Sequence, residues 1–241
     1  MNAQTLNAFL PDIIKSRIAI HFLEQANFSI QTNEYKGKVR FNLWDGFILQ
    51  KLLFKKDLER KLVSIKKFKI VWPFIIKKRI LMPLVNDKGI YCFYSKELIK
   101  ELKSLIGDLD CLEVAAGDGT LTKFLTNEGI SCIATDNYSW EHYIKYPSFV
   151  LRLDAKVALE QYKTNVVICS CPPPESNFEK HVFSSDSVKM YIVIGTKNKL
   201  YSGNHKLYEK QDNFTMEINE KLSSLILPLA KDNAVYIFRR K

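Results

Sequence analysis

The chain has 241 residues, of which 46% are hydrophobic, and it carries a formal net charge of +10. This much apolar sequence can bury a large core, so the composition excludes a disordered chain. The longest uncharged apolar stretches, such as IVWPFII, are too short to span a bilayer, and the N-terminus lacks the pattern of a signal peptide. We therefore expect a cytoplasmic protein that has no membrane partner.

Positive charge is concentrated in the first part of the chain. Residues 1–107 contain 20 Lys and Arg against 9 Asp and Glu, whereas residues 108–241 contain 16 and 17. Residues 51–80 contain 11 basic and 2 acidic residues, interleaved with aromatic side chains. Such a surface favours an acidic partner. The charge distribution predicts two functional regions, a basic and aromatic-rich one at the front of the chain and a nearly neutral one behind it.

The five cysteines do not form a metal-binding pattern. Cys92, Cys111, Cys132 and Cys169 lie in apolar, strand-like stretches, which is typical of reduced buried thiols. Cys169 and Cys171 are separated by one serine, a spacing unlike that of zinc sites, and no His/Cys cluster follows. The sequence therefore predicts no metal site.

Before residue 95 the sequence predicts helices and one extended segment. Residues 7–30 have apolar side chains close to a 3.6-residue period, and residues 51–69 place leucines on one face and lysines on the other. The segment KIVWPFI is predicted to be extended, because Pro73 is unfavourable inside a helix.

From residue 95 onward, apolar strand-like runs alternate with helix-like segments. SKELIKELKSLI is predicted to be a helix with Ser95 as its N-cap. The segments that follow are CLEVAA, LTKFLTNEG, SCIATD, SWEHYIKY, FVLRLDA, KVALEQY, NVVICS and MYIVIG. This alternation predicts a parallel sheet covered by helices on both faces. The last stretch, SSLILPLAKDNAVYIFRR, predicts a terminal hairpin with its turn at Lys231 to Asn233.

Residues suited to ligand binding follow four of the predicted strands. Ligands bind open parallel sheets at the carboxyl ends of the strands. The first strand leads through Glu113 into AAGDG, where small residues let backbone amides approach a ligand and the next helix offers its positive end. Asp136 follows the second strand, 23 residues beyond Glu113, a spacing typical of an acid that binds a ribose diol. Asp154 follows the third strand, and the rigid loop CSCPPP follows the fourth.

Together these motifs resemble those of the class I S-adenosylmethionine-dependent methyltransferases. LEVAAGDGTL resembles their first motif, ATDNYSW the second, LRLDA the third and VVICSCPPP the fourth. The resemblance covers residues 95–241 and implies a Rossmann-like α/β fold with a seven-stranded sheet, mostly parallel with a C-terminal antiparallel hairpin. It implies a catalytic domain at 95–241 with S-adenosylmethionine as cofactor. Residues 1–94 would then be a helical or mixed extension that binds the substrate or caps the site.

The resemblance also implies roles for individual residues. Gly117 and Gly119 would line the methionine part of the cofactor, and Asp136 would hold the ribose hydroxyls. Asp154 and Ala155 would face the adenine. In full, the implied cofactor-binding residues are Tyr94, Ser95, Glu113, Ala115, Gly117, Asp118, Gly119, Asp136, Asn137, Asp154, Ala155, Ser170 and Cys171.

Both ends of the implied site have further residues. Tyr94 and Ser95 would cap the cofactor carboxylate, whereas Ser170 and Cys171 would reach toward the transferable methyl group. Enzymes that methylate base amines or glutamine amides carry Asn or Asp before the prolines and an aromatic residue after them. Here Cys171 precedes the prolines and no aromatic residue follows them directly, which disfavours methylation of a base amine.

Two positions in the first motif are informative. Ala115 replaces the glycine that often opens the motif, which is tolerable if the position does not need a positive φ. Thr122 stands where a dinucleotide fingerprint needs a third small residue, and this disfavours a dehydrogenase.

The methyl acceptor is the least constrained part of the prediction. A carboxylate is already anionic and needs no general base, whereas an alcohol or ammonium acceptor needs one. Candidate catalytic residues are His142, Tyr143 and His205. We favour a peptide carboxylate, because Arg is scarce against Lys. The chain is also similar, more weakly, to bacterial enzymes that methylate carboxylates of ribosomally made peptides, including lanthipeptides. An rRNA or tRNA methyltransferase is the alternative, and a non-catalytic cofactor-binding interaction module is the second alternative.

Overall fold

The computed structural model describes residues 43–56 and 58–241, so the helix predicted over 7–30 lies outside the described residues. The chain divides into two compact units, Met1–Asp87 and Lys88–Lys241. The predicted boundary at 94/95 falls inside the second unit, because the short strand Phe93–Tyr94 pairs with Ile226–Leu227 of that unit. Among the described helices, none has the length and apolar character needed to cross a membrane.

The described part of the first unit consists of short helices. They are α3 (Leu43–Leu53), α4 (Ile65–Val71), the 3-10 helices η1 (Trp72–Phe74) and η2 (Lys78–Ile80), and α5 (Leu81–Asn86). The prediction of one helix over 51–69 is wrong, because the chain turns after α3, where Phe54 and Arg60 form an isolated antiparallel bridge. The prediction that KIVWPFI is extended is also wrong. Pro73 lies in the first turn of η1, where a missing N–H costs no hydrogen bond.

A buried carboxylate organises the turn that follows η1. Asp45, near the start of α3, is fully buried. Its two oxygens accept hydrogen bonds from the backbone N–H groups of Ile76, at 3.1 Å, and Lys77, at 2.9 Å. Ile75, just before these amides, is also buried. The hydrogen bonds from its backbone amides to the Asp45 side chain therefore hold the turn in place.

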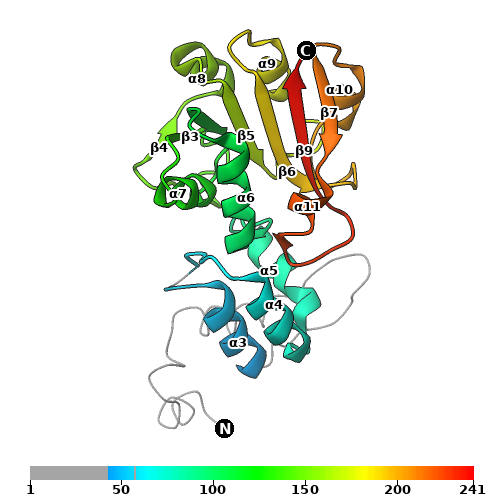
Figure 1. Cartoon of the computed structure of the whole chain (residues 1–241). Coiled ribbons are helices and arrows are strands. Elements are labelled where there is room, and N and C mark those ends of the chain that lie inside the picture. Colours follow the sequence, from blue (N-terminus) through cyan, green and yellow to red (C-terminus); the bar gives the residue numbers. More distant parts are fainter. Residues whose placement is uncertain (1–42, 57) are drawn as a thin grey trace. The chain divides into compact units, whose positions relative to one another are not determined.

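The second unit is built on a seven-stranded sheet with the order β4-β3-β2-β5-β6-β9-β7. Its strands are β2 (Cys111–Val114), β3 (Cys132–Asp136), β4 (Val150–Arg152), β5 (Val166–Ser170), β6 (Met190–Thr196), β7 (Phe214–Ile218) and β9 (Asn233–Arg240). Strands β2 to β6 pair in parallel, whereas β9 is antiparallel to β6 and β7, between which it lies in Figure 1. The predicted seven-stranded, mostly parallel Rossmann-like sheet is confirmed.

Helices cover both faces of this sheet, as the alternation of segments predicted. They are α6 (Lys96–Ile106), α7 (Thr120–Asn127), α8 (Ala155–Tyr162), α9 (Glu179–Ser184), α10 (His205–Lys210) and α11 (Glu220–Ser223). Leu112 and Val114 of β2 belong to a buried cluster that includes side chains of α8, α9 and α10. Glu113, between them, points to the opposite face, where it bonds to Thr122 of α7. Ser95 caps α6 as predicted.

Two predicted details of the second unit are wrong. Residues 139–146, predicted as a helix, form turns over 139–143 and have no regular structure over 144–146. The predicted hairpin over 223–240 is not one either, because β9 pairs with β7 and β6, while β8 (Ile226–Leu227) leaves the main sheet to pair with β1 (Phe93–Tyr94). An apolar run identifies a buried strand but does not identify the strand beside it.

A second buried carboxylate organises the face that α9 and α10 cover. Glu179 is fully buried. Its Oε1 accepts hydrogen bonds from the hydroxyls of Tyr191 at 2.9 Å and Tyr208 at 2.5 Å. Its Oε2 accepts from the Ser176 hydroxyl at 3.1 Å and the Asn204 backbone N–H at 2.9 Å. Burial raises the pKa of this carboxyl, and the four hydrogen bonds oppose that shift. One side chain thus ties α9 to β6, to α10 and to the loops that precede both helices.

Replacing this carboxylate tests how much it stabilises the fold. We expect Glu179→Ala to lower the free energy of unfolding by about 3–5 kcal/mol, because it leaves several buried donors without an acceptor. Urea unfolding followed by circular dichroism measures the change. The exposed Glu160 of α8 provides the matched control, and Glu160→Ala should change stability by less than about 0.5 kcal/mol.

The Glu179→Gln variant adds a pH test, because it keeps the shape and removes the titration. The raised pKa means that the folded protein binds this proton more tightly than the unfolded chain does. The contribution of Glu179 to stability therefore falls as pH rises from the ordinary glutamate pKa through the raised one. The unfolding free energy of the natural protein, relative to that of the Gln variant, should decrease over this range. A rise with pH would contradict the assignment.

Candidate functional site

The junction between β2 and α7 is fixed by a buried hydrogen-bonded pair. Glu113 is 1% exposed, and its Oε2 accepts hydrogen bonds from the Thr122 backbone N–H at 2.9 Å and from the Thr122 hydroxyl at 2.5 Å. Thr122, whose size disfavours a dinucleotide cofactor, therefore has a structural role at this junction. The pair fixes the orientation of α7 relative to β2, and therefore the conformation of the loop between them.

That loop has three residues in the left-handed region of backbone conformation. The φ angles are +50° at Ala115, +57° at Gly117 and +66° at Gly119. Ala115 therefore occupies a position that needs a positive φ. Alanine was predicted to be tolerable there only if the position did not need one, so that condition is not met. A Cβ on Gly119 would lie 2.6 Å from side-chain atoms of Phe149 and Val150. A Cβ on Gly117 would make only an ordinary van der Waals contact, 3.8 Å from the Ile144 Cδ1, so packing is less tight there than at Gly119.

Asp136 joins the ends of β2 and β3. The side chain is 7% exposed, and its Oδ2 accepts a hydrogen bond from the Gly117 backbone N–H at 2.9 Å. Its Oδ1 accepts one from the Tyr138 backbone N–H at 2.8 Å. An ionised carboxylate offers about four acceptor positions, so two amides leave capacity for further donors. The structure thus brings together two residues that the sequence predicted for one site.

Two stacked tyrosines shape the loop after Asp136. The rings of Tyr138 and Tyr146 lie 3.8 Å apart and nearly parallel, and the Tyr138 hydroxyl donates to the Val150 carbonyl at 2.5 Å. The Tyr146 hydroxyl is buried and lies beside the Asp136 carboxylate. Burial, followed by the charge of Asp136, raises the pKa of this hydroxyl. Tyr146 was not singled out from the sequence, because nothing in the spacing indicates that its ring returns to Asp136.

Three other predicted site residues accept backbone hydrogen bonds from nearby residues of the loops in which they lie. The Asp154 Oδ1 accepts from the Lys156 backbone N–H at 2.9 Å and so caps α8, with Ala155 buried beside it. Asp118 and Asn137 accept from the backbone N–H two residues later, each at 3.0 Å. These bonds position the loops at the ends of β2, β3 and β4. The part that each side chain plays toward a cofactor stays a prediction.

The end of β5 carries a cluster of hydroxyls and thiols. The Tyr94 hydroxyl donates to the Ser170 Oγ at 2.7 Å, and the Cys92 Sγ lies 3.6 Å from the same oxygen. Cys171 has a φ of +54°, and its backbone N–H donates to the Ile194 carbonyl at 2.7 Å. A hydrogen bond with Cys92, together with burial, raises the pKa of the Cys171 thiol. Tyr94, Ser170 and Cys171, predicted for one site, therefore meet at this strand end.

Ser95 differs from Tyr94 in its surroundings. It is fully buried, and its hydroxyl accepts from the Leu98 backbone N–H at 2.9 Å. This gives the side chain a structural role at the start of α6, next to the hydroxyl cluster.

The three candidate catalytic residues are not close together. His142 and Tyr143 are exposed on the turns after β3, whereas His205 begins α10, after β6. Two strands separate β3 from β6, so the strands that lead to these segments lie roughly 14 Å apart in the sheet. The His205 ring nitrogen Nε2 lies 3.1 Å from the Ser202 carbonyl, and burial lowers the pKa of the imidazole. The structure therefore separates His142 from His205 as alternative candidates.

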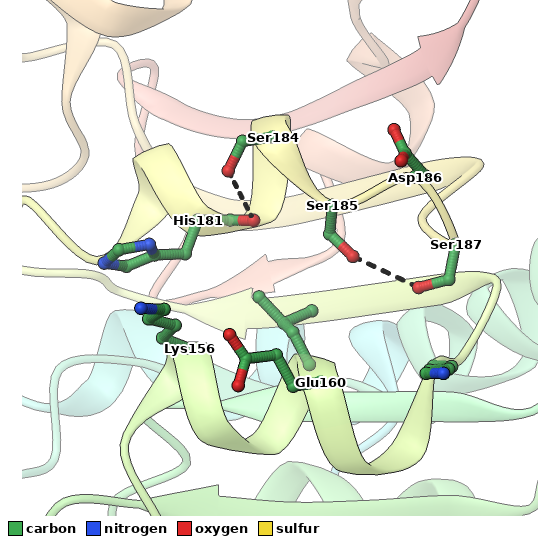
Figure 2. A pocket seen from close by; sticks show the side chains of 9 residues that line it. Lys156, Glu160, His181, Ser184, Ser185, Asp186 and Ser187 are labelled. Carbon is green, nitrogen blue, oxygen red and sulfur yellow. Dashed lines mark hydrogen bonds between the residues drawn. The ribbon is translucent and has the colours of Figure 1, made fainter.

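A cavity of about 440 Å³ lies on another part of the unit, between α8 and α9. Figure 2 shows Lys156 and His181 at one end and serines along the α9 side. The residues that line it include none of those predicted for the cofactor or catalytic site. It is therefore separate from the strand-end cluster.

Comparison with known proteins identifies similar folds and no family. No protein-family model matches the chain, and no curated protein matches it. Among solved structures, it is similar to a magnesium protoporphyrin IX methyltransferase from Synechocystis PCC 6803 with bound SAM, at 16% identity and a TM-score of 0.42, over 60% of this chain and 77% of that one. It is also similar to the glycopeptide N-methyltransferase MtfA, at 11% identity and a TM-score of 0.42, over 59% of this chain and 88% of that one.

The match to the CurJ carbon methyltransferase has 13% identity and a TM-score of 0.37 and covers 55% of this chain. It spans 48% of that chain, about half its length. Sequence identities of this size concern the fold alone.

Substitutions in the β2–α7 loop test its unusual backbone. We expect Ala115→Gly to keep or raise stability by up to about 1 kcal/mol, because glycine adopts a positive φ without the Cβ penalty. Gly119→Ala should lower stability by about 2 kcal/mol or more, since its Cβ would overlap Phe149 and Val150. Thermal unfolding measures both changes. Gly129, which has a positive φ and no atom closer than 3.9 Å, provides the control. An equal loss in Gly119→Ala and Gly129→Ala would contradict the close packing at Gly119.

Proposed function

We propose that this chain transfers a methyl group from S-adenosylmethionine to an acceptor. The observation that carries the proposal is the 2.9 Å hydrogen bond between the Gly117 backbone N–H and the Asp136 carboxylate. It joins two adjacent parallel strands at their carboxyl ends, where sheets of this kind bind ligands. The glycine loop and the acid are the residue types that the resemblance to class I methyltransferases assigns to the cofactor.

The residues at this edge fit such a cofactor. Gly117 carries no side chain to shield its backbone, and the only atom of the described residues that an added Cβ would meet within 4 Å is the Ile144 Cδ1, at 3.8 Å. Asp136 has acceptor capacity left for the hydroxyls of a ribose. The buried Tyr146 hydroxyl adds a polar group beside that carboxylate. A ligand with several hydroxyls would bond to the acceptor positions that Asp136 has left.

At the end of the site where the acceptor would bind, side chains of the protein would orient the acceptor. The bound cofactor would supply an electrophilic methyl group on a sulfonium, and alignment is the main requirement for its displacement. Tyr94 donates to Ser170, and the Ser170 hydroxyl donates in turn to the Cys171 Sγ at 3.9 Å, a long bond that it would exchange for one to an acceptor oxygen. The raised pKa keeps the Cys171 thiol protonated near neutral pH, so it is a weak competing nucleophile.

The acceptor that we propose is a carboxylate on a ribosomally made peptide, methylated on oxygen during natural-product biosynthesis. A carboxylate, with a pKa near 3.5–4, is ionised and needs no general base. This suits a site in which the half-buried His205 already faces the Ser202 carbonyl. Glu175, at the end of the proline loop, is paired with Lys206 at 2.6 Å, which reduces its repulsion of an anionic acceptor.

An RNA acceptor is the second candidate. The 11 basic and 2 acidic residues within 51–80 favour it, because lysines of such a segment can neutralise phosphates. Binding of rRNA or tRNA would weaken steeply with salt, whereas failure to retain either RNA at low salt removes this candidate.

The cofactor assignment predicts the effect of one substitution. We expect isothermal titration calorimetry to detect S-adenosylmethionine binding, and Asp136→Ala to weaken it by about tenfold or more, because it removes the ribose acceptor and releases the Gly117 amide. The exposed Asp212 supplies the matched control, since Asp212→Ala should bind with unchanged affinity. Unchanged affinity in a folded Asp136→Ala protein would refute the assignment.

The acceptor assignment predicts the outcome of a mass measurement. A peptide encoded beside the gene should gain one methyl group when it is incubated with the protein and S-adenosylmethionine. Amidation of its C-terminus should abolish the gain, because an amide is not an anionic oxygen nucleophile. A methyl group that persists on the amidated peptide excludes the terminal carboxylate. The Asp136→Ala protein is the control for enzymatic origin.

A further inference from the structure

Three large apolar side chains protrude from the first unit beside a run of basic residues. Ile70, Phe74 and Ile76 are 59%, 69% and 75% exposed. Residues 65–80 contain six basic residues and no acidic one. The basic residues are Lys66, Lys67, Lys69, Lys77, Lys78 and Arg79. We call the three apolar side chains and these six basic residues the basic–apolar surface.

The backbone leaves the three apolar side chains exposed. Ile70 and Phe74 are four residues apart in a segment that continues from α4 into η1, so they lie on the same helical face. Ile75 is extended, with φ of −86° and ψ of 111°, and its side chain turns inward, whereas those of its neighbours Phe74 and Ile76 are exposed. Ile75 is 1% exposed, which means that the buried side is already occupied by this residue.

This arrangement is rigidly supported. Asp45 holds the Ile76 and Lys77 amides with both carboxylate oxygens. The rings of Phe68 and Trp72 stack at 4.7 Å within the same segment, and Phe68 is fully buried. The exposure of Phe74 and Ile76 is therefore a consequence of fixed backbone geometry and of two buried anchors.

We propose that the basic–apolar surface binds the surface of an anionic lipid bilayer. Protruding apolar side chains insert between lipid headgroups, while the surrounding lysines contact the anionic charge. A peptide partner would be recognised through a groove or pockets that receive its side chains, whereas these three side chains of the protein are themselves largely exposed. RNA would favour aromatic stacking and arginine, but two of the three apolar side chains are aliphatic and five of the six basic residues are lysines.

This inference is independent of the proposed methyl transfer. The sequence predicted no membrane partner because it has no segment long enough to span a bilayer, and a peripheral contact needs no such segment. The consequence is that the chain would act near a membrane and on a substrate present there.

Vesicle co-sedimentation of the full chain tests the proposal. We expect the protein to sediment with phosphatidylcholine vesicles that contain phosphatidylserine, and much less with phosphatidylcholine alone. Phe74→Ser with Ile76→Ser should weaken binding by about tenfold or more, because inserted apolar area is lost. Lys66→Glu with Lys69→Glu should weaken it similarly, and high salt should mimic that effect. Lys100→Glu with Lys180→Glu, on exposed helical positions of the second unit, is the charge-matched control and should bind normally.

Insertion has a direct optical readout. In a Phe74→Trp protein the added fluorescence should shift to shorter wavelength on anionic vesicles and be quenched by brominated lipid chains. A Tyr201→Trp protein, exposed on the second unit, should show neither change. Equal sedimentation of natural and Phe74→Ser/Ile76→Ser proteins would overturn the proposal. So would retention of RNA or of acidic peptides, lost in the same variants, without binding to vesicles.

Discussion

The second unit depends on a buried carboxylate that gathers four donors. Glu179 bonds to Tyr191 of β6 and Tyr208 of α10, and to two loop groups that precede α9 and α10. An ionised side chain in this position is costly unless its hydrogen bonds are complete, because the interior solvates charge poorly. Once they are complete, the proline loop after β5 and the loop after β6 have fixed positions relative to the sheet. The proposed acceptor end of the candidate site depends on this arrangement.

The proposed cofactor end is built from a different and more local set of contacts. Its residues come from β2, β3 and the loops after them, and the Gly117–Asp136 bond joins those loops directly. Asp136 and Asp154 already accept hydrogen bonds from backbone amides of the loops at the ends of these strands. A ligand would thus meet acids that are already oriented, which lowers the entropy lost on binding.

The sequence was a good guide to the elements and a poorer guide to their partners. Alternating apolar runs predicted the parallel strands, and Ser95 predicted the start of α6, because burial and capping leave local patterns. The pairing of β9 with β7 was missed, since pairing depends on residues far apart in the chain. The positive φ of Ala115 was also missed, because alanine can adopt that conformation at a modest cost and so gives no signal. Glu179 did have a signal: it lies three and four residues before Val182 and Phe183, on the buried face of α9.

The proline loop after β5 has one more consequence for chemistry. Pro172, Pro173 and Pro174 have no backbone N–H. The amides on either side are engaged, that of Cys171 with the Ile194 carbonyl and that of Glu175 with the Gly203 carbonyl. The backbone of residues 171–175 therefore offers an incoming oxygen no hydrogen-bond donor. An oxygen lone pair that accepts no hydrogen bond is more nucleophilic than one that does. This loop would therefore preserve the nucleophilicity of an acceptor atom bound next to it.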